Sequence, residues 1–131
     1  SQRKEKKQDF TPNVIGELSA KLCGTDQRTT YEPTAGNGSM LIADWYTKLN
    51  NKFPWEFLPS MNQVECWELS DRSIPILLLN LSIRGIMGVV YHGDVLEKTI
   101  KQKYILLNRH DDALAFSEIH KVYNNAHIIK L

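Results

Sequence analysis

The chain has 131 residues, 42% of them hydrophobic and 24% charged, which predicts one globular domain and excludes two. Its formal net charge of +1 provides no global field to attract nucleic acid or a membrane surface, so such binding would need a local patch. The two cysteines, Cys23 and Cys66, are too few for a disulfide framework, and we expect a cytoplasmic protein in which both are buried.

The first residues predict a tail and then a helix. Residues 1–8, "SQRKEKKQ", are polar and mostly charged, which predicts a flexible tail and not a secretory signal, so the domain is expected to span 9–131. "FTP" predicts a helix start with Thr11 as N-cap and Pro12 in the first turn, and Gly24 is expected to end this helix.

Strands and helices are then expected to alternate along the chain. The strands are predicted at residues 29–32, 63–69, 88–96, 103–108 and 126–131. The helices are predicted at residues 39–49, 72–85 and 111–123, the second of them capped by Ser70 or Asp71. This alternation predicts right-handed crossovers, a mostly parallel sheet and an α/β layered fold.

The apolar run at residues 74–91, "IPILLLNLSIRGIMGVVY", needs a separate interpretation. It contains Asn80 and Arg84, and Gly85 and Gly88 bracket a change from a helical to a strand pattern. We therefore expect a buried helix followed by a buried strand, and no membrane partner.

The glycine turn between the strand at 29–32 and the helix at 39–49 is a candidate ligand site. Glycines let a ligand approach the backbone closely, and the start of a helix offers unpaired N–H groups. No lysine follows Gly38, which excludes a Walker-type phosphate loop, and Leu41 breaks the dinucleotide pattern GxGxxG. A plain turn remains an alternative, because two glycines alone are a weak pattern.

Two carboxylates are expected beside this turn. Glu68 ends the second predicted strand and Asp94 ends the third, and the carboxyl ends of parallel strands line one crevice. A carboxylate at the position of Glu68 can accept hydrogen bonds from both ribose hydroxyls. A carboxylate at the position of Asp94 can accept a hydrogen bond from an adenine amino group. Because no cation for a pyrophosphate is expected there, the pattern favours an adenosyl ligand without phosphates.

Four segments carry a resemblance to a known family. They are "DFTP" (9–12), "YEPTAGNGSML" (31–41), "ECWELSD" (65–71) and "YHGDVL" (91–96). In order and spacing they resemble the S-adenosylmethionine-binding half of N6-adenine DNA methyltransferases, above all the modification subunits of type I restriction–modification systems. The resemblance covers residues 9–108. It implies a truncated Rossmann-like methyltransferase fold, an open and mostly parallel sheet flanked by helices. It also implies S-adenosylmethionine as cofactor, and DNA and specificity or modification subunits as partners.

The resemblance also implies roles for individual residues. Those expected to contact S-adenosylmethionine are Phe10, Thr11, Pro12, Glu32, Pro33, Thr34, Ala35, Gly36, Asn37, Gly38, Ser39, Glu68, Leu69, Asp94 and Val95. Glu32 would lie beneath the methionine amino group, Glu68 would hold the ribose and Asp94 would accept from the adenine amino group. Leu69 would pack on the adenine, with Val95 close by.

The catalytic motif of that family is altered in this chain. The family uses Asn-Pro-Pro followed by Tyr or Phe to hold a flipped adenine for in-line attack on the methyl group. Here Asn108 occupies the asparagine position, but Arg109, His110 and Asp111 follow it. The resemblance implies an adenine-specific DNA methyltransferase, and the altered motif argues against methyl transfer by this chain alone.

Three functional interpretations follow. The first is a methyltransferase domain, whole or a fragment, whose DNA-handling parts lie elsewhere. The second is a non-catalytic cofactor-binding or interaction protein, of phage origin, acting with or against a restriction–modification complex. The third is a dinucleotide-binding oxidoreductase, which Leu41 opposes.

Other clusters of reactive or aromatic side chains receive structural interpretations. His92 with Asp94 is expected to be a strand-end pair, and His110 with its acidic neighbours a helix-start cap, so no metal site is expected. The aromatic side chains near residue 53 can form either a base-stacking platform or a small satellite core, and the proline-containing connector favours the core. They are Trp45, Phe53, Trp55 and Phe57.

Overall fold

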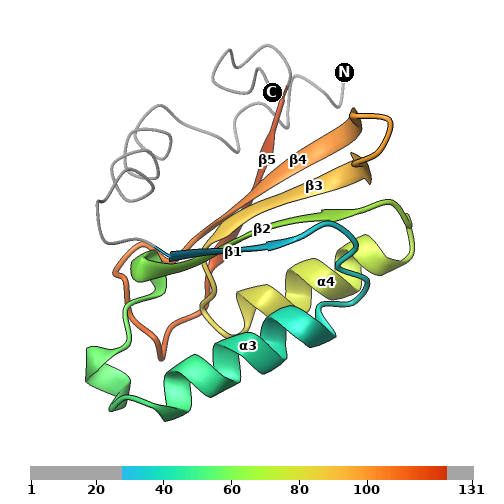
Figure 1. The fold of residues 1–131 in the computed structure, drawn as a ribbon. Helices are drawn as coiled ribbons and strands as arrows, with labels where there is room; N and C mark the ends of the chain where they lie inside the picture. Colours follow the sequence, from blue (N-terminus) through green and yellow to red (C-terminus); the bar gives the residue numbers. More distant parts are fainter. Residues whose placement is uncertain (1–27, 124–131) are drawn as a thin grey trace.

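The computed structural model describes residues 28–123, which form five strands and two α-helices (Figure 1). The strands are β1 (Arg28–Glu32), β2 (Asn62–Glu68), β3 (Gly88–Asp94), β4 (Thr99–Leu107) and β5 (Glu118–Val122). The α-helices are α3 (Ser39–Asn50) and α4 (Ser73–Ser82), and the short 3-10 helices η2 (Pro54–Glu56) and η3 (Pro59–Met61) lie in the connector before β2. The predicted tail at 1–8, helix at 11–24 and strand at 126–131 lie outside the described residues.

The strands form one mixed sheet in the order β1-β2-β3-β4-β5. The first three are parallel, with Glu32 opposite Cys66 and Glu68 opposite His92. β4 is antiparallel to β3, and β5 is antiparallel to β4. The carboxyl ends of β1, β2 and β3 therefore lie together at one edge of the sheet, which we call the carboxyl edge.

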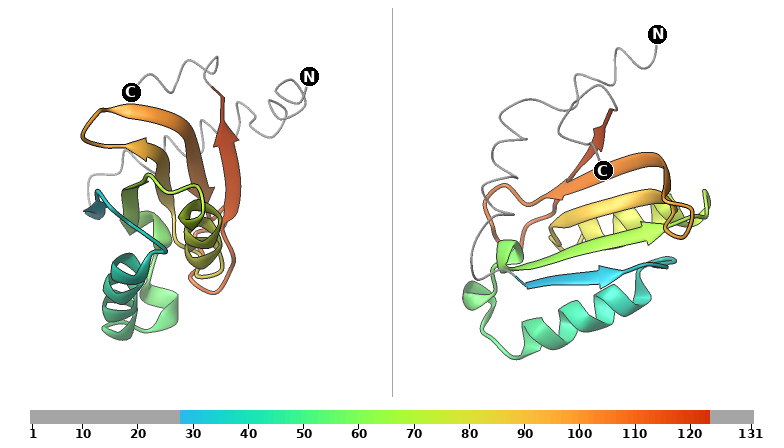
Figure 2. Two further views of the ribbon diagram at one scale, coloured as in Figure 1. Left: turned by 90° about the vertical axis from the view of Figure 1, so that its right-hand side faces the viewer. Right: turned by 45° about the horizontal axis from the view of Figure 1, so that its top comes forward.

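The two helices pack on the same face of the sheet (Figure 2). Their apolar side chains meet alternate side chains of the strands, because successive residues of a strand point to opposite faces. The centre of this core consists of Leu41, Val64, Cys66, Leu77, Leu81, Val90 and Leu106, none more than 5% exposed. Burial of each large aliphatic side chain contributes about 1.5–3 kcal/mol, so this layer holds the helices on the sheet.

The predicted Rossmann-like methyltransferase fold, with a mostly parallel sheet flanked by helices, is wrong. Only β1, β2 and β3 are parallel; β4 lies beside β3 in the opposite direction, and both described helices cover one face. The physical reason is the length of the connection between β3 and β4, which is only residues 95–98. A parallel crossover needs a dozen or more residues, so the chain turns back as a hairpin.

The predicted helix at 111–123 is also wrong. This segment is a loop followed by β5, whose Ile119 lies opposite Leu106 of β4. Leu114 and Phe116, which contribute to the helical pattern, are 81% and 72% exposed. Pairing with β4 outweighs the local preference, because strand formation depends on the neighbouring strand more than on intrinsic propensity.

The helices predicted at 39–49 and 72–85 are confirmed, with small differences at their ends. α3 begins at Ser39, directly after Gly38 in the left-handed conformation. Before α4, the Ser70 hydroxyl accepts hydrogen bonds from the backbone N–H groups of Arg72 and Ser73, so Ser70 acts as the predicted cap. Between residues 28 and 123, no helix combines the length and the apolar character required to cross a membrane.

Candidate functional site

The glycine turn at residues 33–38 connects β1 to α3 at the carboxyl edge. The Ala35 N–H donates to the Trp67 carbonyl over 2.8 Å, and the Gly38 N–H donates to the Ala35 carbonyl over 2.9 Å. Gly36 and Gly38 have φ angles of 60° and 97°, in the left-handed region that side chains disfavour. The turn is therefore a fixed structure attached to the end of β2.

The two glycines serve different purposes. A Cβ atom on Gly38 would lie 3.0 Å from Cδ1 of Leu77, so this glycine allows the start of α3 to pack closely against α4. A Cβ atom on Gly36 would meet no atom within 4 Å. Open space beside the backbone is what a closely approaching ligand requires, and only Gly36 of this pair has it.

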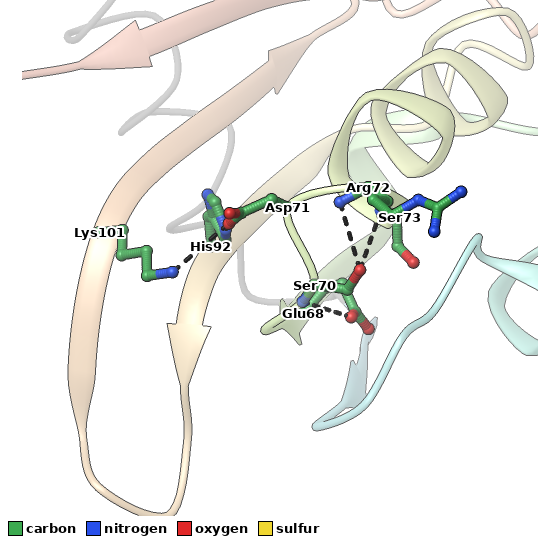
Figure 3. Close-up of polar contacts among 7 residues, drawn as sticks. All are labelled: Glu68, Ser70, Asp71, Arg72, Ser73, His92 and Lys101. Carbon is green, nitrogen blue, oxygen red and sulfur yellow. Dashed lines mark hydrogen bonds and ion pairs between the residues drawn. The ribbon is translucent and has the colours of Figure 1, made fainter.

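Glu68 joins the glycine turn to the start of α4. Its Oε1 accepts the Gly36 N–H over 2.6 Å. Its Oε2 accepts the Ser70 N–H over 2.8 Å (Figure 3). An ionised carboxylate offers about four acceptor positions, so these two bonds leave capacity for two further donors. The side chain is thus fixed in place and still able to accept hydrogen bonds from a diol.

Glu32 ends β1 beside a buried thiol. Its Cα is paired with that of Cys66, which is fully buried on the helix-covered face. Burial, reinforced by the charge of Glu32, raises the pKa of the Cys66 thiol to about 12. The thiol therefore stays neutral at physiological pH and is no candidate nucleophile.

Asp94 ends β3 at the same edge but caps its own turn. Its Oδ1 accepts the N–H groups of Leu96 over 3.0 Å and Glu97 over 3.3 Å. His92, the partner of Glu68 in the sheet, lies two residues before Asp94, which is about 7 Å along a strand. Asp94, the predicted adenine acceptor, is therefore near Glu68, and its Oδ1 already accepts hydrogen bonds within the turn.

The structure pairs His92 with Asp71, not with Asp94. His92 Nε2 lies 2.8 Å from Asp71 Oδ1, and Lys101 Nζ of β4 lies 3.4 Å from the same oxygen (Figure 3). The hydrogen bond to His92, followed by that to Lys101, lowers the pKa of the Asp71 carboxyl below its ordinary value. This cluster ties the β2–α4 connection to β3 and β4. The sequence indicates Asp71 only as a helix cap, and no local pattern around it indicates its partners on β3 and β4.

The other residues predicted to contact the cofactor are distributed around the turn. Pro33, Thr34, Asn37 and Ser39 are exposed, Ala35 is buried, Leu69 is 53% exposed after β2 and Val95 lies in the β3–β4 turn. The Asn37 carbonyl accepts from Nδ2 of Asn80 over 2.8 Å, so α4 also supports the turn. Phe10, Thr11 and Pro12 lie outside the described residues.

Between residues 28 and 123, no three His, Cys, Asp or Glu side chains are grouped so that they could hold a metal ion.

Asn108 lies at the opposite edge of the sheet from the glycine turn. It follows β4, where Leu106 is paired with Gly88 at the start of β3, so the length of β3, about 20 Å, separates it from the carboxyl edge. Its Nδ2 donates to the carbonyls of Gly85 and Asp112, and its Oδ1 accepts the Asp112 N–H. The side chain is 1% exposed and fully engaged in holding two loops together. The structure does not bring it together with the other predicted site residues.

Comparison with known proteins identifies no relative of this chain. No protein-family model, no curated protein and no solved structure matches it. Its function is therefore inferred from the chemistry of the carboxyl edge.

Proposed function

We propose that the carboxyl edge binds the adenosyl part of S-adenosylmethionine. The observation that carries this proposal is the 2.6 Å hydrogen bond from the Gly36 N–H to Glu68. A carboxylate with free acceptor positions therefore lies directly beside the open backbone at Gly36, as the binding of ribose hydroxyls requires. The resemblance of residues 31–41 and 65–71 to cofactor-binding segments of N6-adenine DNA methyltransferases supports this choice of nucleoside.

The charges of the edge support a ligand without phosphates. Glu32, Glu68 and Asp94 end the three parallel strands, and Lys101 near this edge is already paired with Asp71. A pyrophosphate would therefore approach mainly carboxylates, with Arg72 as a nearby cation. S-adenosylmethionine instead carries a sulfonium and an ammonium group, which these carboxylates attract. The edge therefore favours the methyl donor over NAD or ATP.

Each acidic residue has a specific part in this binding. Glu68 accepts from the ribose hydroxyls with the lone pairs that Gly36 and Ser70 leave open. Asp94 uses Oδ1 for its turn, and Oδ2 accepts from the adenine amino group. Glu32 attracts the methionine ammonium group at the end of β1.

The position of Asn108 favours a non-catalytic role for the chain alone. A catalytic asparagine must reach the amino group of a flipped adenine next to the cofactor, whereas Asn108 is buried at the other edge. We infer that the chain holds the cofactor within, or in opposition to, a DNA-modification complex whose other subunits handle DNA.

Titration calorimetry with S-adenosylmethionine, S-adenosylhomocysteine and NAD tests the binding proposal. We expect both adenosyl ligands to bind, the cationic one more tightly, and NAD to give no signal. Equal binding of NAD and S-adenosylmethionine would contradict the proposal. Incorporation of labelled methyl groups into adenine-containing DNA by the chain alone would overturn the non-catalytic role. It would not contradict the proposed binding site.

A further inference from the structure

Helix α4 is apolar on two opposite sides. One side enters the core through Ile74, Leu77, Leu78 and Leu81. The outer side carries Ile76 and Leu79, and Ile83 directly after the last helical residue continues it; they are 52%, 58% and 44% exposed. Because a helix that is apolar all round is normally covered all round, this outer stripe is a candidate binding surface.

The outer stripe borders a groove between the two helices, which lie side by side beneath the sheet (Figure 1). This α3–α4 groove is open, has a volume of about 700 Å³ and is lined mainly by Ile42, Trp45, Tyr46, Ile83 and Arg84. Tyr46 is 58% exposed, so its ring is accessible from outside. The groove thus extends the apolar surface of α4 across to α3.

Arg84 is the only charged residue that lines the groove. Its Nη1 donates to the Asn80 carbonyl over 2.8 Å, and its guanidinium lies 6.0 Å from the centre of the Trp45 ring. Among residues 28–123, no carboxylate is close enough to form an ion pair with it. A guanidinium has five N–H donors, so most of its hydrogen-bonding capacity is open to an anion from outside.

We propose that the α3–α4 groove, together with the adjoining outer stripe of α4, binds the apolar face of an amphipathic helix of a partner protein, with a carboxylate of that helix paired to Arg84. Helices bind in grooves through anchors at positions i, i+3 or i+4 and i+7, and the stripe from Ile76 to Ile83 spans about 10 Å, or two helical turns. The positive charge at an otherwise apolar groove selects an acidic helix over a basic one. This proposal does not rest on the nucleoside site, although Ser39 borders both.

The test uses the full chain and two synthetic amphipathic peptides of equal length, one of leucine and glutamate and one of leucine and lysine. Fluorescence anisotropy of the labelled peptides is expected to show at least about tenfold tighter binding of the acidic peptide. Arg84→Glu reverses this preference, and Leu79→Asp weakens binding of both peptides. Lys52→Glu and Leu96→Asp change exposed residues outside the groove and leave both affinities unchanged.

Three results would overturn the proposal. The first is equal binding of both peptides, and the second is a preference that Arg84→Glu leaves intact. The third is sedimentation of the protein alone as a dimer that Leu79→Asp dissociates, which would assign the groove to a second copy of the chain. Thermal unfolding by circular dichroism checks that each variant is folded. Should Leu79→Asp unfold, the charge reversal at Arg84 decides the test.

Discussion

The backbone N–H of Gly36 donates to the carboxylate of Glu68 over 2.6 Å, although the two residues are 32 positions apart in the sequence. The same carboxylate accepts the Ser70 N–H, so one side chain fixes the β1–α3 turn relative to the β2–α4 connection. Hydrogen bonds to a charged acceptor contribute about 1.5–3 kcal/mol each, more than neutral ones. The proposed nucleoside site depends on this junction.

Alanine at the two glycines is predicted to have different effects. Gly36→Ala places a methyl group in open space, so the loss of stability is limited to about 1–2 kcal/mol from the left-handed backbone. The methyl group occupies the space beside the backbone, and we expect the affinity for S-adenosylmethionine to fall at least about tenfold. Titration calorimetry and thermal unfolding measure the two effects separately.

Gly38→Ala is the matched comparison. Its methyl group would lie 3.0 Å from Leu77 in addition to the backbone cost, so stability should fall further than in Gly36→Ala. The folded fraction should retain more of its ligand affinity. If Gly36→Ala binds as the unmodified protein does, the open space beside Gly36 is not used by the ligand.

Asn108→Ala is predicted to affect stability and not nucleoside binding. The change leaves the Gly85 carbonyl and both backbone groups of Asp112 without their side-chain partner. The Asp112 carbonyl still accepts from the Ala115 N–H, so the cost comes mainly from the Gly85 carbonyl and the Asp112 N–H. Each unsatisfied buried group costs about 1–3 kcal/mol, and we expect a total loss of about 2–4 kcal/mol in urea unfolding. The exposed Asn50→Ala serves as control, with a change within about 0.5 kcal/mol. A folded Asn108→Ala protein that no longer binds S-adenosylmethionine would place Asn108 in the site after all.

Acid sensitivity is predicted at Glu118. Hydrogen bonding from Arg109 is the main cause that lowers the Glu118 pKa from 4.5 to about 2. Because the folded pKa is below the unfolded one, the stabilisation is complete above pH 4.5 and is lost as the pH falls through about 2. The side chain is 43% exposed and solvent screens the pair, so we expect at most about 1 kcal/mol.

Unfolding free energies measured from pH 6 to pH 2 check this expectation. The unmodified protein should lose stability more steeply below pH 4.5 than Glu118→Gln does. Glu97→Gln changes an exposed carboxylate in the β3–β4 turn and should leave the pH profile unaltered. Identical profiles for the protein and Glu118→Gln would show that the ion pair adds nothing to stability.

Local signals were sufficient to predict the part of the fold from β1 to β3. Gly38 before α3 and the Ser70 cap before α4 fixed the helix starts, and apolar spacing identified the strands between them. The turn at residues 95–98 is not recognisable as a hairpin from the strand patterns around it, because such patterns give no direction of pairing. This connection is too short for a parallel crossover, so its length alone would have predicted the hairpin.

The candidate site was predictable only where it depended on parallel strands. Glu68 lies beside Gly36 because β1 and β2 end at the same edge, as the alternation of elements implied. The reversal of β4 moves Asn108 to the other edge, and no local pattern around residue 108 contains that information. The pairing of His92 with Asp71 likewise depends on which face of β3 the imidazole occupies.

The most direct test of the account is calorimetric titration of S-adenosylmethionine into the protein and into Glu68→Gln and Glu65→Gln. In Glu68→Gln the amide nitrogen cannot accept a hydrogen bond from Gly36 or Ser70, so we predict at least about tenfold weaker binding. Glu65 lies on the opposite face of β2, and Glu65→Gln should bind as the unmodified protein does. Equal affinities in all three proteins, or no binding to any of them, would contradict the central claim.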